Sequence, residues 1–117
     1  MASRVLITGS REWVDEDKMV RALSLLPEHI VELVHGGARG ADLMAEKLWT
    51  SWRGYRALQI VAEWDTLGKA AGVIRNQHMV DLGDYAVCLA FPLGESRGTR
   101  DCMARARKAG ILVLEVT

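Results

Sequence analysis

Three short segments rich in glycine, each carrying an arginine, lie between an apolar run and a helical pattern. They are Thr8-Gly9-Ser10-Arg11, Gly36-Gly37-Ala38-Arg39-Gly40-Ala41-Asp42 and the stretch from Pro92 to Asp101. A strand that passes into a helix through glycines leaves backbone N–H groups free at the positive end of the helix dipole, which suits a phosphate or another anion. Three such segments in a small chain favour a nucleotide-like ligand.

The candidate ligand-binding residues are the glycines, arginines and small polar residues of these segments, with one further polar pair. They are Gly9, Ser10, Arg11, Gly36, Gly37, Arg39, Gly40, Asp42, Arg75, Asn76, Gly94, Ser96, Arg97, Gly98 and Thr99. Arg11, Arg39 and Arg97 are the expected anion clamps, because a guanidinium binds phosphate in a bidentate way and keeps its charge. Each could instead be a solvated surface residue, and the glycines could simply permit tight turns and close helix–strand packing.

Aromatic and acidic residues near the same segments have two interpretations each. Trp13 and Trp64 follow strand ends, where an indole could stack on a base or pack in the core or at its rim. Asp42 and Asp101 are expected in the first turns of their helices, where an acid stabilises the dipole and could also hold a ribose hydroxyl. Arg75 and Asn76 could reach a ribose or phosphate, or cap and pair locally.

Several familiar sites are not predicted. The glycines at 36, 37 and 40 form neither GxGxxG nor a Walker A motif, and no Lys-Ser or Lys-Thr follows them. Cys88 and Cys102 lack metal-ligand spacing and are expected to be buried thiols, and the three histidines add no zinc pattern. No Ser-His-Asp or Cys-His arrangement is legible. We therefore expect no metal site and no cofactor.

Length and charge set further limits. A chain of 117 residues is expected to form a single domain over residues 1–117. Fifteen basic and fifteen acidic residues give a net charge of zero, so no general affinity for nucleic acid or anionic membrane is expected. The N-terminus is too short and too poor in apolar residues for a signal peptide, and no run approaches the roughly 18 apolar residues of a membrane span. A cytoplasmic protein is the resulting expectation.

The elements that would position the three segments alternate along the chain. Short apolar runs predict strands at Arg4 to Thr8, Ile30 to His35, Leu58 to Ala62, Tyr85 to Phe91 and Ile111 to Val116. Helical periodicity predicts helices through Met19 to Leu26, Ala41 to Trp52, Ile74 to Leu82 and Thr99 to Gly110. The segment from Glu63 to Gly72 is predicted as a loop that enters the third helix. Asp15 is the expected N-cap of the first helix, with Val14 and Met19 forming a hydrophobic staple.

This alternation predicts an α/β fold, a Rossmann-like doubly wound parallel sheet of five strands with helices on both faces. The expected strand order is 3-2-1-4-5. In this order the first, second and fourth strands are neighbours, and the three special segments follow them at one edge of the sheet. We therefore expect the segments to converge on one crevice.

The same segments resemble the SLOG superfamily, a Rossmann-like group that includes the LONELY GUY phosphoribohydrolases and the DNA-processing protein DprA. The resemblance is greatest to the small YspA-like branch, which is common in bacteria and their phages. It is carried by Val5 to Arg11, His35 to Asp42, Gly72 to Asn76 with Met79, and Gly94 to Asp101. It implies a nucleotide or nucleotide-derived ligand over the strand ends, and often a homodimer.

The LONELY GUY enzymes hydrolyse the N-glycosidic bond of nucleoside monophosphates with an arginine and a glutamate of a PGGxGTxxE motif. Aligned with that motif, Gly98-Thr99 fall on its GT and Cys102 falls on its glutamate. The resemblance therefore leaves Arg97 and Asp101 as the catalytic candidates. Asp101 is one residue short of the motif position and, by helix geometry, points about 100° away from it.

Three functions follow from these observations. The first is nucleotide binding by a sensor or accessory domain. The second is an N-glycosidic hydrolase of nucleoside 5′-monophosphates, with Asp101 or Glu95 recruited as its carboxylate. The third is a DprA-like partner in DNA processing, against which the neutral net charge and the lack of a basic aromatic stripe count. Nucleic acid and membrane are therefore not the expected partners.

Overall fold

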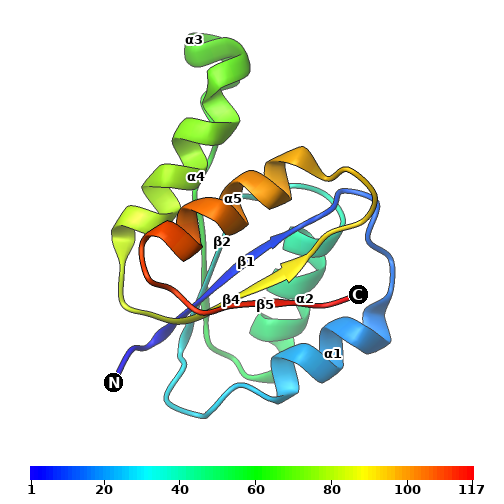
Figure 1. The fold of residues 1–117 in the computed structure, drawn as a ribbon. Coiled ribbons are helices and arrows are strands. Elements are labelled where there is room, and N and C mark those ends of the chain that lie inside the picture. Colours follow the sequence, from blue (N-terminus) through cyan, green and yellow to red (C-terminus); the bar gives the residue numbers. More distant parts are fainter.

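The computed structural model covers residues 1–117 (Figure 1). Five strands form one parallel sheet, and helices connect them. The strands are β1 (Arg4–Gly9), β2 (Glu32–His35), β3 (Arg56–Gln59), β4 (Tyr85–Phe91) and β5 (Val113–Glu115). The helices are α1 (Glu16–Ser24), α2 (Ala41–Trp52), α3 (Trp64–Leu67), the 3-10 helix η1 (Gly68–Ala70), α4 (Ala71–Leu82) and α5 (Arg97–Lys108). The sheet order β3-β2-β1-β4-β5, with every pairing parallel, confirms the predicted fold.

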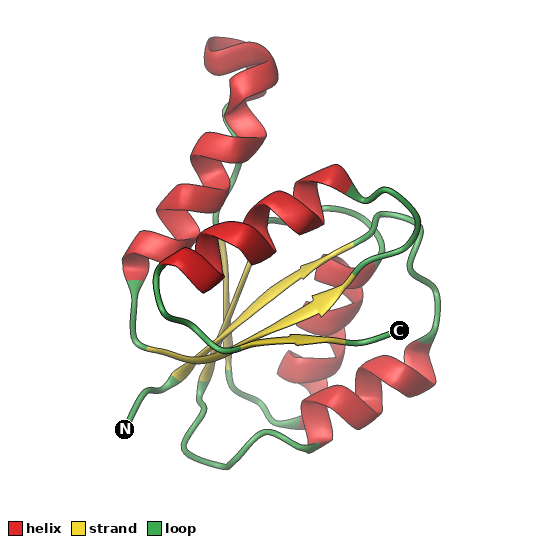
Figure 2. Ribbon diagram, in the orientation of Figure 1, coloured by secondary structure: helices red, strands yellow, loops and turns green.

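Two helical layers sandwich the sheet. Helices α1 and α2 cover one face, and α4 and α5 cover the other (Figure 1, Figure 2). Successive side chains of a strand point to opposite faces. In the central strand β1, Val5 and Ile7 accordingly pack in the α1–α2 core, whereas Leu6 packs in the α4–α5 core. A strand buried on both faces reads as a continuous apolar run, which is the pattern that β1 and β4 show in the sequence.

The start of α1 is partly as expected. Asp15 caps the helix by accepting a hydrogen bond from the backbone N–H of Lys18 at 3.0 Å. The predicted staple between Val14 and Met19 is wrong, because the Val14 side chain is 83% exposed. Trp13 is buried instead, edge-on to Phe91 with ring centroids 5.2 Å apart.

The segment between α2 and α4 differs most from the prediction. Strand β3 covers Arg56–Gln59 rather than Leu58 to Ala62, because its pairing with β2 runs from Arg56 opposite Glu32 to Gln59 opposite His35. The stretch predicted as a loop forms α3 and η1, which project beyond the sheet in Figure 1. Neither contains a buried residue, so no apolar periodicity marks them in the sequence. No helix has both the length and the apolar character needed to cross a membrane.

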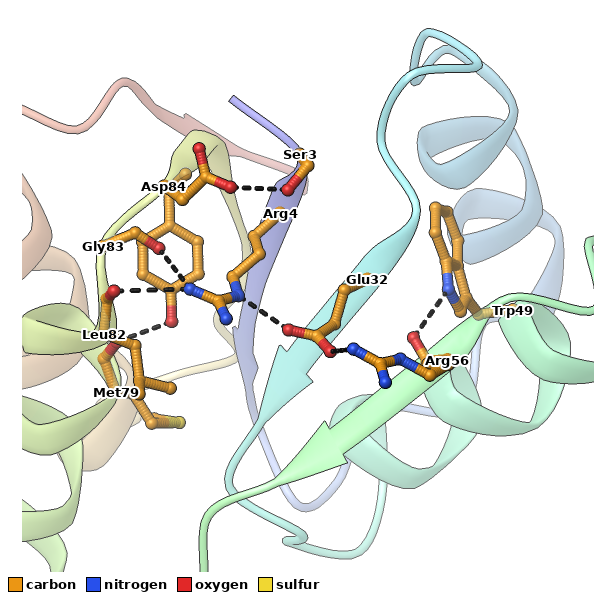
Figure 3. A network of polar contacts seen from close by, with 10 residues as sticks. Ser3, Arg4, Glu32, Trp49, Arg56, Met79, Leu82, Gly83 and Asp84 are labelled. Carbon is orange, nitrogen blue, oxygen red and sulfur yellow. Dashed lines mark hydrogen bonds and ion pairs between the residues drawn. The ribbon is translucent and has the colours of Figure 1, made fainter. Parts of the chain in front are cut away.

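A polar network ties together the amino-terminal ends of four strands (Figure 3). Glu32 accepts from Arg4 Nε at 2.6 Å and from Arg56 Nη2 at 2.9 Å, and these three residues are direct partners across β1, β2 and β3. Arg4 also donates to the carbonyl of Gly83 at 3.1 Å, just before β4. The hydrogen bond that Arg4 donates to the Glu32 carboxylate raises the pKa of Arg4 above its ordinary value. The network fixes the strand register at the edge opposite the special segments.

Replacement of Glu32 by Gln is expected to lower the free energy of unfolding by about 2–4 kcal/mol, because it leaves the partly buried Arg4 guanidinium without its carboxylate. Urea denaturation followed by circular dichroism measures this loss. The matched control is Arg56→Gln, which removes an 85% exposed partner of the same carboxylate and should cost less than about 1 kcal/mol. Equal losses in the two variants would contradict the network as described.

Candidate functional site

A crevice of about 800 Å³ opens at the carboxyl edge of the sheet, above the ends of β1, β2, β3 and β4. The structure thus brings the three predicted segments together. The predicted residues that line the crevice are Gly9, Ser10, Arg11, Gly36, Gly37, Asp42, Arg75, Asn76, Ser96, Arg97, Gly98 and Thr99. Arg39, Gly40, Gly94 and Asp101 do not line it.

The glycine segment after β2 does not offer the free N–H groups that we expected. The N–H groups of Gly36 and Ala38 donate to Asp42 Oδ2 at 3.1 and 3.3 Å, and that of Gly37 donates to His35 Nδ1 at 2.9 Å. Three consecutive backbone donors are therefore satisfied by side chains of the same segment. An anion cannot use them without displacing the Asp42 carboxylate or the His35 ring.

Gly40 has a structural reason to be glycine. Its φ of 82° is in the left-handed region, and a Cβ there would lie 2.5 Å from the carbonyl oxygens of Ser10 and Arg11. The start of α2 packs directly on the β1 segment at this point, where the Ala41 N–H donates to the Ser10 carbonyl at 3.1 Å. Close backbone approach, the alternative interpretation of this glycine, is what the structure shows.

His35 supports the same segment from beneath. It is fully buried, and because Nδ1 accepts from the Gly37 N–H, the hydrogen-bond network assigns the ring proton to Nε2. Nε2 then donates to Glu46 Oε1 at 2.9 Å on α2. The glycine segment is therefore held by two side chains of α2, Asp42 directly and Glu46 through His35.

Asp42 is the most unusual group of the crevice. It is in the first turn of α2, as predicted, and is only 5% exposed. Its Oδ2 holds two backbone N–H groups, while its Oδ1 is buried without any hydrogen-bond partner. Burial raises the pKa of this carboxyl to about 6, against the opposing influence of the backbone N–H groups of Ala38 and Gly36 and of the Arg75 charge. A buried acceptor without a donor costs free energy, so this oxygen marks a place for a donor.

The segment after β4 keeps its donors free of side chains. Helix α5 follows Ser96, a left-handed residue with φ of 44° that gives the helix no side-chain cap. The Ser96 hydroxyl donates instead to Thr99 Oγ1 at 2.8 Å. Since Ser96 to Thr99 line the crevice, the positive end of α5 faces it. Of the expected N–H cradles, this one remains available to an anion.

The predicted arginine clamps separate in the structure. Arg11 and Arg97 are exposed and line the crevice, and Arg97 pairs with Glu95 at 3.4 Å. Arg39 pairs with Glu12 at 2.9 Å and lies outside the lining. A further cation, Lys69 of η1, lines the crevice and was missed because η1 was predicted as part of a loop.

Arg75 and Asn76 brace the crevice wall. Arg75 Nη1 donates to the Gly36 carbonyl at 2.6 Å, and its Nε donates to Asn76 Oδ1 at 3.0 Å. Asn76 Nδ2 donates to the Gly98 carbonyl at 3.2 Å and to Asp101 Oδ2 at 3.0 Å. Two adjacent residues of α4 thus join the segment after β2 to the start of α5, which is the local-pairing interpretation of this pair.

The two positions singled out by the LONELY GUY motif do not reach the crevice. Asp101 is the fifth residue of α5 rather than part of its first turn, and its Oδ2 accepts from Asn76 and from Arg105 Nε at 2.9 Å. Cys102 is fully buried in the α4–α5 core, where burial raises the pKa of its thiol to about 11. Neither side chain lies among the residues around the crevice.

The aromatic candidates also separate. Trp13 packs in the α1–α2 core, so of its two interpretations core packing is confirmed and base stacking is wrong. Trp64 is 59% exposed and lines the crevice, with its ring over Gly72. Apolar side chains from the β3–α3 connection and from α4, Val61 and Val73, also line the crevice and were not predicted. The crevice therefore has an aromatic and apolar rim on the side of α3.

The 3-2-1-4-5 parallel sheet, with a glycine-lined crevice at its carboxyl edge, defines a Rossmann-like fold. Residues 3–66 match the family model described as the YspA, cpYpsA-related SLOG family. The chain belongs to this SLOG family, and the resemblance stated from the sequence is confirmed.

Two known proteins are similar over nearly the whole chain. The Gene 61 protein of Mycobacterium phage D29 is 48% identical over 120 residues, covering 95% of this chain and 94% of that protein. The structure of DNA processing protein A (DprA) from Streptococcus pneumoniae aligns with a TM-score of 0.76 at 16% identity. This alignment covers 96% of this chain but 49% of the DprA chain, so the present chain spans about half of that length. The likeness to DprA shows the shared fold.

Because its native pKa of about 6 lies above the ordinary value near 3.9, Asp42 should make stability depend on pH. Its contribution is fully present below about pH 4 and is lost as pH rises through about 6. Asp42→Asn removes this titration. The difference in unfolding free energy, variant minus wild type, should therefore increase by about 2–3 kcal/mol between pH 4 and 7. Urea denaturation at several pH values measures it; a constant or falling difference would contradict the raised pKa.

Proposed function

We propose that this chain binds a nucleotide or nucleotide-derived ligand in the crevice, as a sensor or accessory domain. The observation that carries the proposal is the presence, in one crevice, of two complementary sites. The uncapped positive end of α5 can accept an anion, and the unpartnered Asp42 Oδ1 can accept a hydrogen bond. A ligand that satisfies both carries an anionic group and a neutral donor, as a nucleotide does.

The charges around the α5 end support a phosphate as the anionic group. Arg11, Arg97 and Lys69 reach the crevice from three different segments and are exposed, so a phosphate meets them without first breaking a buried pair. Charge-assisted hydrogen bonds from backbone N–H and guanidinium groups are the strong ones. The single ion pair to be exchanged is that of Arg97 with Glu95, which is exposed on both sides.

The remaining volume suits the rest of a nucleotide. Small-molecule sites commonly occupy about 300–1,000 Å³, and the crevice of about 800 Å³ falls in the upper part of that range. Trp64 offers an exposed indole face at the rim, where a base could stack. We assign the base to this rim because the floor of the crevice is polar at Asp42 and Asn76.

Hydrolysis of a nucleoside 5′-monophosphate is the second candidate function, and one observation favours it. Glu95 lines the crevice and lies 3.4 Å from Arg97, so an acid and an arginine do meet at the start of α5. Asp101, the other carboxylate considered, is engaged by Asn76 and Arg105. A hydrolase would therefore use Glu95 and Arg97.

We further propose that residues 1–117 act as one ligand-binding domain that self-associates as a homodimer. Two core clusters on opposite faces of one sheet support the single domain. Exposed apolar side chains in α3 and in the connection before it, Val61, Trp64 and Leu67, support a protein contact there. The DNA-processing alternative has the DprA-like fold in its favour and the zero net charge against it.

Thermal denaturation with a panel of nucleoside mono-, di- and triphosphates and ADP-ribose tests the proposed binding. A ligand present at about 100 times its Kd stabilises by about 2.7 kcal/mol, which raises the Tm of a domain of this size by several degrees. Arg97→Ala should weaken binding at least roughly tenfold, because it removes a charged donor. Chromatography of the same mixtures detects free base, which would indicate hydrolysis.

The control for Arg97→Ala is Arg39→Ala, since Arg39 belongs to the equivalent segment after β2 but does not itself line the crevice. This variant should bind the ligand as the wild type does. Failure of every nucleotide to raise the Tm, or an equal loss in both variants, would overturn the proposed site.

A further inference from the structure

We propose that Asp42 makes the crevice selective for ribose: its free Oδ1 accepts a hydrogen bond from a sugar hydroxyl, so that ribonucleotides bind in preference to their deoxy analogues. This inference rests on the proposed nucleotide binding and assigns the sugar to one residue. It follows from how the carboxylate is held, from where it lies relative to the anion cradle, and from how the other acids of the crevice are engaged.

The Asp42 carboxylate is fixed before any ligand arrives. Its Oδ2 accepts from the N–H groups of Gly36 and Ala38, and the residue is only 5% exposed, so it does not swing freely. Its Oδ1 has no hydrogen-bond partner, and Asp42 is among the residues that line the crevice. An ionised carboxylate only accepts hydrogen bonds, so the missing partner is a donor such as a hydroxyl and is not an anion.

The position of Asp42 relative to α5 favours a sugar hydroxyl as that donor. Strands β2 and β4 flank β1, so the segments that follow them lie about two strand spacings apart, roughly 10 Å. A phosphate at the start of α5 would place its own ribose between the two segments. The hydroxyls of that ribose then come closest to Asp42, whereas the base extends toward the rim.

No other acid of the crevice offers the same fixed acceptor. Glu12 and Glu95 line the crevice but are largely exposed, and each pairs with an arginine. Asp101 lies outside the lining, and its carboxylate is used by Asn76 and Arg105. Selectivity for a hydroxyl arises when a buried polar group is left unpaired by the analogue that lacks it. Asp42 alone meets that condition.

The experiment compares ribonucleoside monophosphates with their 2′-deoxy and 3′-deoxy analogues by titration calorimetry at pH 8, where Asp42 is ionised in the free protein. The wild type should bind the ribonucleotide at least roughly tenfold more tightly than one or both analogues, whichever base is used. Asp42→Asn keeps the shape but presents a neutral amide N–H2 in place of the carboxylate oxygen. A sugar hydroxyl can accept from this amide, but the charge-assisted bond is lost, so the preference should fall markedly. Asp17→Asn makes the same change at an exposed aspartate in the first turn of α1, away from the crevice; it is the control and should retain the preference.

The outcomes separate this inference from the function on which it rests. Binding of nucleotides without a preference for ribose, or a preference that persists in a folded Asp42→Asn variant, overturns the role of Asp42 alone. A preference that follows the exocyclic amine of the base and not the sugar hydroxyl also overturns it. Absence of binding to any nucleotide overturns the proposed function as well. If Asp42→Asn does not fold, the comparison of analogues with the wild type still decides the question.

Discussion

The backbone N–H groups at the carboxyl edge of the sheet need hydrogen-bond partners. The polarity of the crevice depends on whether protein side chains supply those partners or leave the N–H groups free. After β2, the side chains of Asp42 and His35 satisfy three consecutive N–H groups. After β4, Ser96 leaves the start of α5 without a side-chain cap. Two segments that look alike in sequence thus differ in polarity, because one presents a carboxylate and the other presents donors. That contrast makes the crevice suited to a ligand with two different ends.

The two ends can act on one ligand only if their separation is fixed. Arg75 and Asn76, adjacent on α4, provide this by binding the carbonyls of Gly36 and Gly98. Carbonyl oxygens are the groups that remain for bracing once the N–H groups are committed. At the opposite edge, the pairing of Arg4, Glu32 and Arg56 holds the register of three strands. The sheet is therefore fixed at both edges by side-chain hydrogen bonds, and Arg75 and Asn76 preorganise the crevice.

Strand order and the convergence of the loops could be predicted because they depend on features that are local in sequence. Continuous apolar runs mark β1 and β4, and glycines mark the points where strands pass into helices. The boundaries of β3 depend on pairing with β2, which is not local, and the predicted strand was displaced by two residues at its start. The helix α3 buries no residue, so it leaves no periodic signal.

The candidate site was predictable as a set of residues but not as a set of roles. Most of the glycine-segment residues line the crevice. Arg39 does not, and it donates to Glu12. Asp101 does not either, and its carboxylate accepts from Asn76 and Arg105. Arg39 and Glu12 are 27 residues apart in the sequence, and Asp101 and Asn76 are 25 residues apart. Such distant side-chain pairs cannot be predicted from the spacing of residues along the chain. An aspartate two residues after Gly40 was a visible signal. Its capture of the Gly36 and Ala38 N–H groups follows only from the turn that the segment adopts.

The burial of position 102 bears on whether such a crevice binds or cleaves. Cys102 is enclosed by the apolar cluster that includes Leu6, Val34 and Met79, and it has no access to the crevice. A carboxylate at this position would have to be desolvated in that cluster or would push α5 away from the sheet. A thiol of raised pKa fits there as a small apolar group. A ligand at the start of α5 therefore meets backbone donors, Arg97 and the exposed acid Glu95, a combination that favours holding a phosphate over breaking a glycosidic bond.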